Sequence, residues 1–209
     1  MTETTARRAD PLTRELVVDA ALRLVEEQGV AALSMRRLAA ELGVAATAIY
    51  WHVGNRHALL DELVDRIVSD IGAVRPSGST PQSRVASIAR SLRRKLLARP
   101  DLVGLAHERG RTSAMFHPAE AALARELTAA GRRGEEAALA VKAIEFLVIG
   151  SVILQRAVAR GPAQSPDDAL WRDERGLDPS LVAALAASPD HDEVFEVGLR
   201  SLVASLLTP

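Results

Sequence analysis

The chain has 209 residues, 48% of them hydrophobic, and a formal net charge of −1 at pH 7. This length and composition provide for a substantial apolar core, arranged as one large domain or two small ones. Because the sequence contains no cysteine, disulfides, thiolate metal sites and cysteine nucleophiles are excluded, and a reducing cytoplasm is compatible.

Charge and hydropathy along the chain favour a cytoplasmic protein with no membrane partner. The N-terminal residues lack an apolar run behind their charges, so we expect no signal peptide. The most apolar stretch, Phe146 to Leu154, is too short to span a bilayer. Residues 1–70 hold eight arginines against eleven carboxylates, so a nucleic-acid site would have to be a local feature.

The first strong helical pattern lies at residues 13–28. Apolar residues recur there at helical spacing, Thr13 is a suitable N-cap, and Gly29 can end the helix. Residues 1–11 are polar and charged. We interpret them as a frayed terminus, with an arm that touches DNA as the alternative.

Residues 34–53 predict two short helices joined by a glycine turn. Ser34 can cap the first helix, Leu38 and Leu42 share one face, and Gly43 supplies the left-handed conformation that ends it. The second helix begins near residue 45 and could project side chains into a major groove. From residue 34 to residue 57, three arginines oppose one glutamate, which suits a phosphate-facing patch. The predicted partner is therefore double-stranded DNA.

This region also carries a specific series of ordered residues. The series comprises Ala20–Leu22, Gly29, Ser34–Ala39, Leu42–Val44, Ile49–Val53 and Asn55–Leu60. It resembles the N-terminal domain of the TetR family of bacterial repressors, especially the tetracycline-repressor branch. The resemblance implies an all-α fold, with an N-terminal three-helix helix-turn-helix domain and a larger helical C-terminal domain for ligand binding and dimerisation. It also implies a repressor that binds a palindromic operator as a homodimer and is released by a small molecule.

The resemblance assigns DNA contacts to residues in and around the helix-turn-helix. Arg36 matches a position that contacts a base or a phosphate, and a guanidinium can fork onto guanine O6 and N7. Trp51 matches a position partly packed and partly against DNA, so core anchoring remains an equal alternative. The other predicted contacts are Ser34 and Arg56 with phosphates, Thr47 and Ala48 on the exposed face of the second helix, and Tyr50 and His52 with the phosphate backbone. Residues 45–48 are Ala-Ala-Thr-Ala, which offers few side chains for contacts with base edges and therefore favours readout of DNA shape.

A fourth helix is predicted from Asn55, its cap, to about residue 74, with a broad apolar stripe. Its first half should cover the DNA-reading unit and its second half should enter the next domain. Residues 75–81 form the clearest cluster of helix-breaking residues, so we place the domain boundary there. The predicted domains are a DNA-binding domain at residues 1–75 and an effector-binding and dimerisation domain at residues 82–209.

The rest of the chain also has helical periodicity, without a strand pattern or an internal repeat. Helices are predicted at residues 82–98 and 101–108, from His117–Pro118 to residue 130, and at residues 135–160 and 190–207. A loop is expected at residues 161–166. The last two helices each combine an apolar face with a seam of small residues, which would let a partner helix approach closely.

The helices predicted at residues 135–160 and 190–207 indicate how the protein could form a dimer. The resemblance implies that they pair with their copies in the four-helix bundle of a homodimer, and an intrachain core is the alternative reading of the pattern. The predicted interface residues are Ala143, Leu147, Gly150, Leu154, Gly198, Ser201, Leu202 and Ser205.

Candidate effector-binding residues are polar groups embedded in apolar helical surroundings, since such groups need partners if buried. They are His107, Glu145 and Gln155, with a solvated face as the alternative, and we interpret Arg94 as solvated. In the tetracycline-sensing branch, a histidine and a glutamate help hold a drug-bound magnesium. Arg99 and Leu154 stand near those positions here, which argues against tetracycline–magnesium as the ligand.

Nothing in the sequence points to catalysis. GxSxG, P-loop and Rossmann glycine patterns do not occur, so we predict no enzyme activity and no cofactor. The histidines outside the helix-turn-helix lack a second histidine at helix spacing, so we predict no metal site. The alternative function is a helical small-molecule-binding or scaffolding protein that binds DNA only non-specifically.

Overall fold

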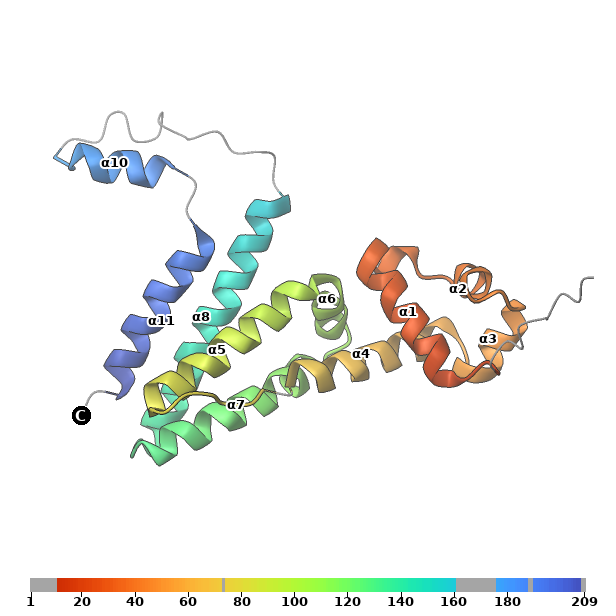
Figure 1. The fold of residues 1–209 in the computed structure, drawn as a ribbon, viewed down its shortest axis with the longest axis horizontal. Helices are drawn as coiled ribbons and strands as arrows, with labels where there is room; N and C mark the ends of the chain where they lie inside the picture. Colours follow the sequence, from red (N-terminus) through yellow and green to blue (C-terminus); the bar gives the residue numbers. More distant parts are fainter. Residues whose placement is uncertain (1–10, 73, 161–175, 188–189, 208–209) are drawn as a thin grey trace, which may run out of the picture. The chain divides into compact units, whose positions relative to one another are not determined.

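The computed structural model describes residues 11–72, 74–160, 176–187 and 190–207, and every regular element in these ranges is a helix (Figure 1). The predicted all-α fold is confirmed. The chain divides into two compact units. The first contains the described residues up to Asp70 together with Arg99–Phe116, and the second contains Ile71–Ala98 and the described residues from His117 onward.

The first unit begins with α1 (Arg14–Gln28), whose ends are those predicted from the sequence. The Thr13 hydroxyl accepts a hydrogen bond from the Leu16 N–H at 3.2 Å, and the Gly29 N–H donates to the Val25 carbonyl at 2.8 Å. These bonds satisfy backbone groups that a helix end otherwise leaves without partners. The predicted frayed terminus lies largely outside the described residues.

Four elements follow α1 directly along the chain in the first unit. They are the short 3₁₀ helix η1 (Val30–Ala32), α2 (Met35–Leu42), α3 (Ala46–Val53) and α4 (Arg56–Gly72) as far as Asp70. Asn55 caps α4 as predicted, because its Oδ1 accepts from the Ala58 N–H at 2.9 Å. The apolar faces of these helices form one core around the fully buried residues Val17, Ala20, Ala21, Leu38, Ile49, Leu59, Leu63 and Ile67.

The second unit is built on three mutually packed helices, α5 (Pro81–Ala98), α8 (Gly134–Arg160) and α11 (His191–Leu207) (Figure 1). Their shared core includes Ile88, Leu92, Ile144, Val148 and Leu199, none more than 2% exposed. The short helix α10 (Pro179–Ala186) was not predicted. It is nevertheless signalled locally, since Asp178 accepts from the Leu181 N–H at 3.2 Å and Pro179 occupies the first turn. The predicted loop at residues 161–166 lies outside the described residues.

The start of α7 (Thr112–Ala129) differs from the prediction. The sequence suggested that His117–Pro118 opens this helix, but α7 contains Pro118 in its interior. That prediction was wrong because Met115 and Phe116, three and two residues before Pro118, are only 1% and 6% exposed. Burying these two large side chains offsets the hydrogen bond that a proline nitrogen cannot donate. The division between the two units also falls here, between Phe116 and His117.

Candidate nucleic-acid interface and effector-domain residues

The turn between α2 and α3 has the geometry that the sequence predicts. Ser34 Oγ accepts from the Arg37 N–H at 3.2 Å and caps α2. Gly43 has φ 66° and ψ 30°, and its N–H donates to Ala40 while the Val44 N–H donates to Ala39. This pair of bonds is the Schellman arrangement that ends a helix on a left-handed residue. The backbone therefore turns sharply and begins α3 at Ala46.

The side chains of α3 separate into an anchored face and an outward face. Ile49 and Val53 are 0% and 3% exposed, and α3 packs against α1 and α2. On the outward face Trp51 is 91% exposed and Tyr50 is 49% exposed. Of the other predicted contacts, Thr47 is exposed, whereas Ala48 and His52 are half-buried. Packing therefore holds the helix from one side and leaves the other side to solvent.

The exposure of Trp51 bears on core anchoring, the alternative reading of this residue. A core anchor would be covered by neighbouring side chains, as Ile49 is. An indole that is 91% exposed contributes little to the core, and its N–H and ring are open to a ligand. The structure thus disfavours core anchoring for Trp51.

The arginines near the turn have different surroundings. Arg36 lies on the exposed side of α2, while Arg37 binds the Gln28 side chain. Arg56 donates from Nε to the Leu33 carbonyl at 3.0 Å and from Nη2 to the Val30 carbonyl at 3.3 Å. These bonds give Arg56 a structural contact with η1 and the chain that follows it, which the sequence prediction did not include.

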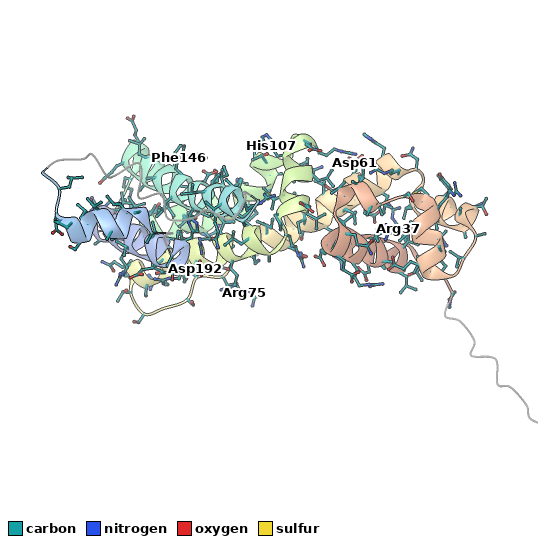
Figure 2. All side chains as sticks on the ribbon, turned by 90° about the horizontal axis from the view of Figure 1, so that it is seen from above. Arg37, Asp61, Arg75, His107, Phe146 and Asp192 are labelled. Carbon is teal, nitrogen blue, oxygen red and sulfur yellow. The ribbon has the colours of Figure 1, made fainter. Side chains whose placement is uncertain are left out.

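A series of ion pairs joins α4, and in one case α1, to the residues that flank α6 (Pro100–Glu108) in the first unit. Arg99 pairs with Asp70 at 2.7 Å and with Glu26 at 2.9 Å. Arg109 pairs with Asp61, whose position on α4 is marked in Figure 2. Arg111 pairs with Asp65 at 2.5 Å. The segment around α6 is therefore attached to the helix that follows the helix-turn-helix, although its residues lie in the predicted effector domain.

The three predicted effector contacts differ in their unit or in their hydrogen-bond partners. His107 lies in the first unit, where it is exposed and its Nδ1 is 3.0 Å from Thr112 Oγ1. Glu145 and Gln155 lie on α8 in the second unit and have different partners. Arg94 is exposed, as the sequence predicts. No group of three or more His, Asp or Glu side chains suited to a metal ion occurs among the residues that the structure describes.

Glu145 belongs to a small charged cluster between α7 and α8. Lys142 donates to Glu120 and, at 2.8 Å, to Glu145. The hydrogen bond from Lys142 is the main cause that lowers the pKa of Glu120, and the bonds to the two carboxylates raise the pKa of Lys142. The Lys142 side chain is 64% exposed, so the cluster is a partly solvated connection between the two helices.

Gln155, which is half-buried, belongs to a polar cluster centred on the buried Arg93, a residue that the sequence prediction missed. Arg93 is 8% exposed and donates to Gln155 at 2.6 Å and to Asp192 at 2.7 Å. The sequence prediction interpreted only its neighbour Arg94 as solvated and did not include Arg93. Arg93 could have been distinguished by its register, because Ile88, Ala89 and Leu92 on the same side of α5 are buried.

The predicted interface residues of α8 and α11 divide into two groups. Leu147 and Gly198 face each other within the chain, since a Cβ added at Gly198 would lie 3.3 Å from Leu147 Cδ1. Gly150, Leu154, Ser201 and Ser205 are exposed, and Ala143 and Leu202 are half-buried.

Large apolar side chains are also exposed on the two helices that carry these exposed interface residues. The exposed apolar residues of these two helices include Leu139, Phe146, Ile153, Leu154, Val194 and Val197. Phe146, labelled on α8 in Figure 2, is 83% exposed. We define the α8/α11 face as these six residues together with Gly150, Ser201 and Ser205. An apolar face of this kind marks an interaction surface.

The apolar character of α8 differs from what the sequence analysis considered when it judged the most apolar stretch too short to span a bilayer. Residues Gly134–Ala159 of α8 form one helix that is long and apolar enough to cross a bilayer by length and composition alone. The prediction considered only the nine most apolar residues, whereas the helix has 27. One such helix is weak evidence for a membrane span, since a core helix passes the same test.

Comparison with known proteins identifies relatives over almost the whole chain. Residues 17–63 match the family model of bacterial regulatory proteins of the tetR family, and residues 76–208 match the tetracyclin repressor-like C-terminal domain. The tetracycline repressor protein class C of Escherichia coli is 32% identical, over 93% of this chain and 90% of that protein.

Solved structures agree with these matches. Apo ActR from Streptomyces coelicolor superposes with a TM-score of 0.66 and 32% identity, covering 94% of this chain and 95% of that one. The complex of ActR with actinorhodin gives the same TM-score and identity and covers 94% and 97%. A TetR variant from Acinetobacter baumannii AYE in complex with minocycline gives a TM-score of 0.60 at 27% identity, covering 95% and 100%.

Proposed function

The chain belongs to the tetR family of bacterial regulatory proteins and is a DNA-binding transcriptional regulator, and from this premise we propose that it represses transcription from a palindromic operator. It binds the operator as a homodimer in the cytoplasm and is released by a small-molecule effector. The observation that carries the proposal is the division of α3, with Ile49 buried and Trp51 exposed.

The DNA-binding role is assigned to the outward side chains of the helix-turn-helix. Thr47, Tyr50 and Trp51 lie on the exposed face of α3, and Arg36 is exposed on α2. An α-helix fits the major groove, and arginine is the commonest partner of guanine there. In a two-fold dimer, the two recognition helices would sit about 34–36 Å apart, which is one turn of DNA. A palindromic site follows from this symmetry.

The homodimer is assigned to the α8/α11 face. Phe146 and Ile153 are 83% and 62% exposed, and Val194 is 58% exposed. A second copy of the same face would remove these side chains from water, each copy supplying the same residues to the other, as in a two-fold interface. The small residues Gly150 and Ser201 allow two helices to approach closely.

Release by an effector requires a ligand that binds two conformers with different affinity. We assign the moving element to α4, which begins next to α3 and extends past Asp70 into the second unit. Because Arg109 and Arg111 pair with carboxylates of α4, α6 would move together with it. A pivot of α4 would then spoil the spacing of the recognition helices.

Relatives suggest which compounds to try first. Solved relatives hold actinorhodin or minocycline, so both are suitable probes. Near the positions where the tetracycline-sensing branch has metal-binding side chains, this chain has Arg99, which is paired with Glu26 and Asp70, and Leu154, which is 56% exposed. Neither side chain is a magnesium ligand. We therefore expect an effector that needs no bound magnesium, and release that disappears on adding a chelator would contradict this.

The test is a gel-shift titration of the protein against the DNA immediately upstream of its own coding region, with excess unrelated competitor. We expect a retained complex that survives the competitor and that an effector releases. Arg36→Ala should weaken this complex and leave the dimer intact, because Arg36 lies on the exposed side of α2. Binding that depends steeply on salt but prefers no sequence, also in a selection from random DNA, would contradict the proposal.

A further inference from the structure

Arg93 is the one charged residue in the buried core among the residues that the structure describes. Its guanidinium divides its hydrogen bonds between two helices. Towards α8, Nε donates to Ser151 Oγ at 3.2 Å and Nη2 donates to Gln155 Oε1 at 2.6 Å. Towards α11, Nη1 donates to Asp192 Oδ1 at 2.7 Å and Nη2 donates to the His191 carbonyl at 3.4 Å.

The same group also stacks on an aromatic ring. The guanidinium carbon of Arg93 lies 4.6 Å from the centre of the Phe195 ring, which is itself buried on α11. This distance is within the range of a cation–π interaction. Arg93, on α5, therefore contacts the first turns of α11 in three ways: an ion pair with Asp192, a hydrogen bond to the His191 carbonyl and a ring contact with Phe195.

The hydrogen bonds of Arg93 can all form only when α8 and α11 keep a defined relative position. Arginine stays charged in a protein, and a buried charge costs several kcal/mol unless hydrogen bonds compensate for its lost hydration. The planar fork satisfies acceptors on α8 and α11 together only when the two helices keep one relative position. A shift of either helix would leave part of the buried guanidinium without an acceptor.

Members of the cluster adjoin residues of the α8/α11 face along the chain. Ser151 follows the exposed Gly150, and Gln155 follows the exposed Leu154. On α11, Phe195 is buried directly after the exposed Val194. Three of the residues that Arg93 contacts are thus chain neighbours of residues on that face, whereas the Asp192 side chain is itself 72% exposed.

We propose that Arg93 is a positioning residue for dimerisation, which sets α8 and α11 in the register that makes their exposed sides one continuous surface. Its observed contacts are with α8 and α11 of its own chain. The proposal rests on the homodimer of the proposed function. It adds that the affinity of two copies for each other depends on a buried guanidinium beneath their interface.

A matched control is available one turn earlier on α5. Arg90 also ties α5 to α11, through two bonds of 2.7 Å to Glu196. Its side chain is 43% exposed, and the carboxylate that it binds lies on α11 and not on α8. Loss of Arg90 removes an ion pair between α5 and α11 without removing the connection between α8 and α11.

The experiment measures the dimer dissociation constant of the full chain by sedimentation or mass photometry, at a temperature where circular dichroism shows native helicity for every variant. Arg93→Met keeps the apolar stem and removes the fork, and should raise this constant by at least about tenfold, or ~1.4 kcal/mol. Arg90→Met should change it by less than about twofold. If Arg93→Met does not fold, Arg93→Lys replaces it, because an ammonium group keeps the charge but cannot span both helices as the fork does.

The outcomes separate this proposal from the dimer on which it rests. A lower melting temperature for the Arg93 variant with an unchanged dimer constant would overturn it, because Arg93 would then serve folding alone. Equal weakening by Arg90→Met would overturn it too, since any attachment of α11 to α5 would then suffice. A wild-type protein that remains monomeric would overturn both proposals, whereas a wild-type dimer with unaffected Arg93 variants overturns only this one.

Discussion

Substitutions of Trp51 and Ile49, two residues apart on α3, test whether one face of this helix serves DNA binding and the other serves stability. Trp51 is 91% exposed and Ile49 is fully buried. Trp51→Ala should therefore change the free energy of unfolding by no more than about 0.5 kcal/mol, as for an ordinary surface substitution. Ile49→Ala removes buried methyl groups and leaves a cavity, so it should cost about 2–5 kcal/mol.

Operator affinity should respond to Trp51. An aromatic side chain at the centre of an interface contributes at least ~1 kcal/mol. A two-fold dimer contains two such residues, so Trp51→Ala should lose about 2 kcal/mol in all. That loss corresponds to about a 30-fold increase in the dissociation constant for the operator.

Two measurements make the comparison. Urea unfolding followed by circular dichroism reports stability without using the tryptophan that is removed, and fluorescence anisotropy of a labelled operator reports affinity. The reasoning is refuted if Trp51→Ala lowers stability by about 2 kcal/mol or more, as loss of a buried side chain would, while the operator affinity stays within about twofold. That result would make Trp51 a core anchor.

Three further predictions concern the structure around the sites. Arg109→Gln removes the ion pair with Asp61 and should speed hydrogen exchange in α6, with a stability loss of at most ~1 kcal/mol. Glu120 has its pKa held below its ordinary value of 4.5 by the bond from Lys142, so the stability it contributes is present above that pH and is lost as the pH falls through the lowered pKa. In an acid titration of unfolding, Lys142→Met should therefore lose this part of the pH dependence. Gly43→Ala, at φ 66° with open space around its Cβ position, should cost ~1–2 kcal/mol in thermal unfolding through backbone strain alone.

Two of these predictions have a control variant, and the third has an outcome that would contradict it. Arg111→Gln removes a more exposed ion pair, at 43% and 58% side-chain exposure, and should have the smaller effect on α6. Gly150→Ala lies in a regular helix with open space around its Cβ position, so in the monomer it should not destabilise. An acid limb of unfolding that is identical in wild type and Lys142→Met would show that Glu120 does not contribute as described.

Local signals in the sequence were sufficient for the helix-turn-helix. Ser34 as a cap, Gly43 as a left-handed stop and Asn55 as the next cap each act on backbone groups within four residues. The apolar spacing around Leu38 and Ile49 then decides which sides of the helices are buried. The all-α fold class and the helices of the helix-turn-helix therefore follow from the chain itself, because caps, turns and helical periodicity are short-range effects.

Tertiary packing decided what short-range rules could not reach. The division of Arg93 from Arg94, the exposure of Trp51 and the pairing of Leu147 with Gly198 each depend on helices distant in sequence. The helical start of α7 before Pro118 and the grouping of α6 with the first unit have the same origin. A periodic pattern shows that a helix has an apolar side, but which neighbour covers it, or leaves it exposed, is settled only when all the helices pack together.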